Sequence, residues 1–149
     1  MKSLMGSVGL GAFALLLFVV PLGCGPSNVE FTPDQIEESK IREVGQVLRE
    51  YQLFKGKPPA SMKDLQSAAG SSPGGYELIK SGEVVVAWNA TLPDTKEEPG
   101  SGSATEVLAY LKKVPQEGGL VLMLDRTVRT MTADEFKAAP KAGSGLSAK

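Results

Sequence analysis

The chain has 149 residues, 17 of them acidic and 16 basic, with one cysteine and no histidine. A length of this order suits one domain, and a formal net charge of −1 lacks the basic excess that nucleic acids attract, so no nucleic-acid partner is expected. The missing histidine excludes Ser-His and Cys-His nucleophiles and His-ligated metals, and a single cysteine excludes an internal disulfide or a cysteine cluster.

The first 24 residues have the order of a secretory signal. They read MKSLMGSVGLGAFALLLFVVPLGC, in which one basic residue, Lys2, precedes an apolar run that ends just before Gly23 and Cys24. A short positive segment, an apolar segment and a small residue before a cut site are typical of an exported protein. The alternative is a retained transmembrane helix over residues 4–23, because about 20 apolar residues span a bilayer.

The lone cysteine directly after this segment resembles the lipobox of bacterial lipoproteins. In that family the cysteine sulfur takes a diacylglyceryl group, the signal is cut before it, and the new amino terminus is acylated. The resemblance implies a signal peptide at 1–23, lipidation of Cys24 and a tether at 24–30. It also implies a protein held to a bilayer through acyl chains on Cys24, in the bacterial cell envelope, facing the periplasm or the exterior. Two or more chains matter, because one acyl chain holds a protein only marginally.

A long helix is predicted over about 33–55. Thr32 and Gln35 have the spacing of a capping box, and Phe31 and Ile36 are placed for a hydrophobic staple. A glycine and two prolines soon after the helix end it. The helix carries one apolar stripe at three- and four-residue steps, which predicts a face packed on the core: Ile41, Val44, Val47, Leu48, Tyr51 and Phe54.

A short second helix and a hairpin are predicted next. The helix starts at Ser61 and ends near Gly70, and a loop follows at 71–75. The runs 76–79 and 83–88 are rich in β-branched and aromatic residues and are separated by a serine and a glycine, which is typical of a β-hairpin.

The sequence of the second half of the domain predicts further strands and a C-terminal helix. Residues 90–105, ATLPDTKEEPGSGSAT, have few apolar side chains and form the longest predicted loop. Three strands and a short capped helix follow in this order: 107–111 within the segment 105–114, then 120–124, 127–131 and 132–139. The domain therefore spans 31–140. The last stretch, 141–149, contains glycine, serine, alanine and lysine with a single leucine, and it is predicted to be a disordered tail.

This order of elements predicts an α+β fold, in which the long helix packs on a small antiparallel sheet of about four to five strands. The segments LREY (48–51) and PPASMKDL (58–65), with Gly56 between them, and the later segment GGLVLMLDRTVR (118–129) are similar to the soluble domain of type II secretion pseudopilins and other pilin-like proteins. The resemblance implies a pseudopilin-like fold. In that family the apolar segment is kept as the filament core, whereas here it precedes Cys24. The resemblance therefore implies a pilin-like interaction domain on a lipid anchor, without filament assembly.

The carboxylates do not predict a catalytic centre. Several are adjacent pairs, such as 37–38, 97–98 and 134–135, whose side chains point to different faces of a helix or strand. The acidic loop around Asp94 lacks the regular spacing of a calcium site. We therefore predict no catalytic residue, no metal and no cofactor, and a protein that is not an enzyme. If the domain binds a ligand, the expected residues are Trp88, Tyr110 and Asp94, because tryptophan is favoured as an interface anchor.

Three functions remain open from the sequence. The leading one is a non-catalytic, lipid-anchored envelope protein with a pseudopilin-like interaction domain. The second is an accessory component of a type II secretion or pilus-like system that contacts pseudopilins, which an exposed apolar patch on the long helix would favour. The third is a lipoprotein that binds a small ligand or carbohydrate, which predicts a pocket lined by Trp88 and Tyr110.

Overall fold

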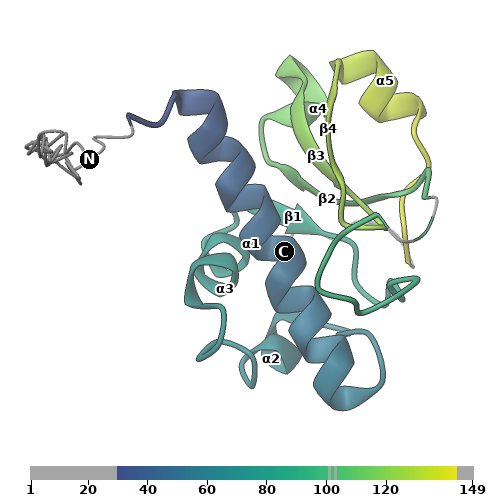
Figure 1. Cartoon of the computed structure of the whole chain (residues 1–149). Coiled ribbons are helices and arrows are strands. Elements are labelled where there is room, and N and C mark those ends of the chain that lie inside the picture. Colours follow the sequence, from purple (N-terminus) through teal and green to yellow (C-terminus); the bar gives the residue numbers. More distant parts are fainter. Residues whose placement is uncertain (1–29, 101, 103, 144–149) are drawn as a thin grey trace, which may run out of the picture. The chain divides into compact units, whose positions relative to one another are not determined.

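The computed structural model describes residues 30–100, 102 and 104–143 (Figure 1), so the predicted signal segment and Cys24 lie outside the described residues. The elements follow the order α1 (Pro33–Lys55), α2 (Met62–Leu65), α3 (Pro73–Lys80), β1 (Val84–Val86), β2 (Val107–Leu111), α4 (Val114–Glu117), β3 (Gly119–Met123), β4 (Val128–Met131) and α5 (Ala133–Ala138). This arrangement confirms the predicted α+β class.

Helix α1 begins and ends where its capping residues predict. The Gln35 N–H donates to Thr32 Oγ1 over 3.3 Å, and the Thr32 N–H donates to Gln35 Oε1 over 2.9 Å. Gly56, at φ 66°, ends the helix and donates its N–H to the Gln52 carbonyl. The buried stripe matches the prediction from Ile41 to Tyr51.

The sheet has four antiparallel strands in the order β1-β2-β3-β4, so each strand pairs with its neighbour along the chain. Val85 lies opposite Tyr110, Tyr110 lies opposite Val121, and Val121 lies opposite Arg129. As the apolar run at 120–124 predicts, β3 is an inner strand. Its four strands are the lower number of the four to five that were expected, because one predicted strand is a helix.

That difference concerns residues 76–79, which were expected to form the first strand of a hairpin and instead belong to α3. Helix α3 packs directly on α1, and an ideal Cβ at Gly75 would lie only 2.2 Å from the Glu43 carbonyl oxygen. The glycines that predicted a loop thus allow two helix backbones to approach. Ile79, one turn after Gly75, is buried at the same junction.

The two faces of the sheet are covered by different helices. On one face, Leu122 lies so close to α1 that an ideal Cβ at Gly45 would be 3.2 Å from its Cδ2 atom. On the other face, the Tyr110 ring packs on Phe136 of α5. Figure 1 shows α1 with α2 and α3 on one side of it and the strands with α5 on the other. One core therefore fills the space between α1 and the sheet and continues under α5.

The predicted helix after Ser61 is shorter than expected, because α2 ends at Leu65 and the chain continues in turns. The one-turn helix α4 was not predicted from the sequence. The closing helix α5 confirms its predicted capping box, in which the Glu135 N–H donates to Thr132 Oγ1 over 3.2 Å.

Residues 141–143 belong to the folded domain rather than to the predicted tail. Lys141 forms a parallel bridge with Val107. The Val107 N–H donates to the Pro140 carbonyl over 2.9 Å, and the Ala142 N–H donates to the Val107 carbonyl over 3.0 Å. Ala142 is fully buried. The fold therefore extends to residue 143, and the rest of the predicted tail lies outside the described residues.

Candidate functional site

Trp88 and Tyr110, the two aromatic residues predicted to bind a ligand, line neither of the two surface depressions described below. Tyr110 is buried, its ring centroid lies 4.6 Å from that of Phe136, and burial raises the pKa of its hydroxyl. Trp88 is half-buried and follows β1, three positions after the partner of Tyr110, Val85. Tyr110 is thus a packing residue under α5.

Asp94 lies in an internal ion pair. Its carboxylate is 3.5 Å from the Arg126 guanidinium, and the two side chains are 19% and 6% exposed. The same carboxylate accepts the Lys96 N–H over 2.9 Å. Asp94 therefore stabilises the conformation of the loop in which it lies.

Arg126 organises this loop from the turn between β3 and β4. Its guanidinium donates to the carbonyl oxygens of Lys96, Glu97 and Glu98 over 2.5, 3.3 and 3.1 Å. Burial lowers the pKa of Arg126, and the nearby carboxylate of Asp94 opposes that effect. Arg126 also has a positive φ of 65°, which an ordinary side chain rarely adopts.

Helix α1 holds the same loop from its other side. Arg49 Nε donates to the Thr95 and Lys96 carbonyls over 2.9 and 2.8 Å. The Gln52 side-chain amide makes two hydrogen bonds with the backbone of Leu92, over 3.0 and 2.9 Å. Residues 92–98 are therefore fixed between α1 and the β3–β4 turn, although their composition alone predicts an unsupported loop.

A small groove lies beside this loop, with a volume of about 130 Å³. Its lining combines the α1 surface, the loop and the buried guanidinium: Arg42, Gly45, Gln46, Glu97, Pro99 and Arg126.

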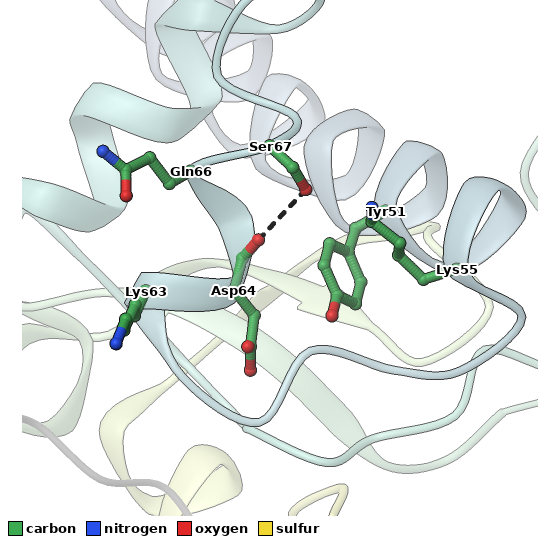
Figure 2. Close-up of a pocket in the computed structure, with 6 residues that line it drawn as sticks. All are labelled: Tyr51, Lys55, Lys63, Asp64, Gln66 and Ser67. Carbon is green, nitrogen blue, oxygen red and sulfur yellow. Dashed lines mark hydrogen bonds between the residues drawn. The ribbon is translucent and has the colours of Figure 1, made fainter.

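A larger depression of about 540 Å³ lies at the C-terminal end of α1 (Figure 2). Tyr51 and Lys55 reach it from α1, and the other residues come from α2 and the turn after it: Lys63, Asp64, Gln66 and Ser67.

The single carboxylate of this depression is already engaged. Asp64 Oδ2 accepts the N–H groups of Ala60 and Ser61 over 2.9 and 3.1 Å, which caps α2. Ser67 Oγ donates to the Asp64 backbone carbonyl over 3.2 Å. Within the part of the chain that the structure describes, Lys55 and Lys63 have no acidic partner within ion-pair distance. The depression therefore presents positive charge.

The last turn of α1 also exposes two apolar side chains. Phe54 is 73% exposed and Leu53 is 52% exposed. Tyr51, Phe54 and Lys55 are three and four residues apart, so they share one side of the helix. Phe54 was expected to face the core with the rest of the stripe. It is exposed because the chain turns away at Gly56, so that burial of the stripe ends at Tyr51.

We call this region the distal surface, and it consists of Leu53, Phe54, Lys55, Lys57 and Lys63. The sequence signal for it is the short run LFKGK at 53–57, in which two apolar residues are followed by two lysines on either side of the glycine that ends the helix. The run alone does not show that its apolar residues stay in solvent, since that depends on where α2 packs.

Searches of protein-family models, curated proteins and solved structures found no match to this chain. No helix among the described residues is long and apolar enough to cross a membrane. The described residues also contain no group of three or more metal-ligating side chains placed to hold an ion.

Proposed function

We propose that the chain is a non-catalytic, lipid-anchored protein of the bacterial cell envelope that acts by binding another protein. The anchor rests on the signal-like segment 1–23 and on Cys24 directly after it. The domain begins only a few residues later, with α1. The tether therefore joins the domain at the N-terminal end of its longest helix.

The observation that carries the binding role is the distal surface. It combines two exposed apolar side chains with three exposed lysines beside an open depression. Helix α1 has 23 residues and is about 34 Å long at 1.5 Å per residue. The distal surface thus lies at the opposite end of α1 from the tether.

The expected partner has an acidic surface with an apolar side chain at its centre. Exposed aromatic residues anchor interfaces, and surrounding opposite charges orient the partner. A pseudopilin is a specific candidate, because the exposed apolar patch on the long helix is the feature that favours an accessory role in a type II secretion or pilus-like system.

The intact mass of the protein purified from bacterial membranes tests the anchor. We expect the mass of residues 24–149 plus a diacylglyceryl group and one N-acyl chain. A full-length mass without lipid would contradict the anchor and leave residues 4–23 as a retained segment.

Crosslinking in living cells tests the distal surface. A photoreactive amino acid replaces Phe54, and in a control protein it replaces Glu77, whose side chain is 63% exposed on α3. We expect position 54 to crosslink to an acidic segment of one envelope protein, and reversal of charge at Lys55 and Lys63 to remove that crosslink. Equal crosslinking from both positions would show that the distal surface is not a specific site.

A further inference from the structure

Two more apolar side chains are exposed at the opposite, N-terminal end of α1. Phe31 is 66% exposed and Ile36 is 47% exposed. They hold the two positions of a hydrophobic staple, which normally cover one another. Because both remain so exposed, any contact between the two leaves apolar surface in solvent.

The position of this pair in the chain limits what can cover it. Phe31 is the seventh residue after Cys24. Seven residues reach at most about 25 Å when fully extended, and about 15 Å on average as a flexible chain. A lipid on Cys24 therefore keeps Phe31 close to a bilayer surface, at an effective concentration high enough for a weak contact to be occupied.

The charges around the pair indicate which kind of bilayer surface it suits. Glu37 pairs with Lys113 over 2.5 Å and Glu38 pairs with Arg42 over 2.6 Å. Among the described residues, Glu30 and Asp34 are exposed at this end and make no such pair. The unbalanced charge beside Phe31 and Ile36 is therefore negative, which favours neutral over anionic headgroups.

We infer that Phe31 and Ile36 insert into the interfacial layer of the bilayer that holds the lipid on Cys24, as a second membrane contact that orients α1. The inference rests on the proposed anchor and adds a lipid-binding site to it. Apolar side chains at a helix end add to the hold of acyl chains in this way. With its N-terminal end on the bilayer, α1 carries the distal surface away from the membrane.

Fluorescence quenching by lipids with brominated acyl chains tests this contact. The full lipidated protein is placed in phosphatidylcholine vesicles with and without the brominated lipid. Phe31→Trp reports on the proposed contact, and Phe54→Trp is the matched control, because it makes the same substitution at an equally open position at the other end of α1. The wild-type protein gives the quenching of Trp88 alone.

After subtraction of the wild-type emission from Trp88, we expect the emission of the introduced tryptophan at position 31 to fall by a factor of two or more below its value in unbrominated vesicles. The Phe54→Trp and wild-type proteins should change little. Addition of phosphatidylglycerol at low salt should reduce the quenching at position 31, since like charges repel across the interface. Quenching at position 31 no greater than at position 54 would overturn the contact while leaving the anchor intact. An intact mass without lipid would overturn the anchor itself, so the two failures are distinguishable.

Discussion

Arg126 alone contacts three backbone carbonyls and one carboxylate of the loop before it. Its planar guanidinium offers five donors in a fixed fork, and three of them meet successive backbone carbonyls while the group also faces Asp94. Those carbonyls belong to a loop with few apolar side chains to bury. The hydrogen bonds from this one buried charge therefore hold the loop together with those from Arg49 and Gln52 of α1.

Replacement of Arg126 by methionine should therefore destabilise the domain by roughly 3 kcal/mol, because the carbonyls of residues 96–98 lose the Arg126 donor and the Asp94 carboxylate loses its ion pair with Arg126. Chemical unfolding in urea measures the change. Arg129→Met is the matched control, since Arg129 is exposed on β4 and its loss should change the free energy of unfolding by less than about 0.5 kcal/mol. Equal effects of the two substitutions would show that Arg126 does not hold the loop.

Ionisation of Glu135 makes the stability of one capping box depend on pH. Its carboxylate accepts the Thr132 N–H over 2.7 Å, and this backbone hydrogen bond, with help from the Thr132 hydroxyl, lowers the pKa of Glu135 below its ordinary 4.5. A lowered pKa in the folded state means that the ionised form stabilises the fold above 4.5 and that this contribution disappears as the pH falls through the lowered pKa.

Glu135→Gln keeps the shape of the capping box and cannot ionise, so it isolates this effect. The wild-type protein should have the higher Tm near neutral pH, and the difference should vanish at a pH well below 4.5. Thermal unfolding by circular dichroism at a series of pH values measures it. Asp134→Asn, in the same helical turn, is the control. A difference in Tm that stays constant into acid would assign the effect to something other than ionisation of Glu135.

At the scale of elements, the contact between α1 and α3 depends on the absence of a side chain. Gly75 brings the backbone of α3 against the Glu43 carbonyl, where a methyl group has no room. The buried Ile79 sits one turn further along the same helix. The approach of the two backbones, rather than local preference, decides that this segment is helical.

Gly75→Ala should consequently destabilise the protein by about 2 kcal/mol, although alanine favours helices more than glycine does. Gly70→Ala is the matched control, because an added Cβ there meets no atom within 4 Å. Thermal and urea unfolding of both variants make the comparison. A Gly75→Ala protein as stable as the control would mean that α3 does not approach α1 as closely as the structure has it.

These elements show what the sequence can and cannot predict. Helices α1 and α5 were predictable because their capping boxes are local: Thr32 and Thr132 each meet a partner three residues on. Helix α3 was mistaken for a strand because its β-branched and aromatic residues favour strands, and its helical state depends on contact with α1. The distal surface was missed for a related reason, since Phe54 continues the apolar stripe and only the turn at Gly56 leaves it exposed.

At the scale of the whole molecule, the end of the described chain closes the second face of the sheet. Helix α5 has only six residues and is too short to be stable by itself. It is held by the Tyr110–Phe136 contact and by Lys141, whose ammonium donates to the Phe136 and Ala139 carbonyls and lies 4.2 Å from the Phe136 ring centroid. Burial lowers the pKa of Lys141. The segment 140–142 then joins β2 by two backbone hydrogen bonds.

A chain that stops after Ala139 should therefore lose roughly 3 kcal/mol of stability, since it lacks both backbone hydrogen bonds, the Lys141 donors and the buried Ala142. A chain that stops after Gly143 keeps all of these groups and is the matched control, with an expected change below about 0.5 kcal/mol. Urea unfolding of the two truncated proteins, followed by circular dichroism, makes the comparison. The first truncation should also expose the ring of Phe136 and increase the binding of a hydrophobic dye. If both truncated proteins unfold at the wild-type midpoint, then residues 140–143 lie on the sheet without stabilising it, and α5 is held by its capping box and its contacts with Tyr110, α4 and β4.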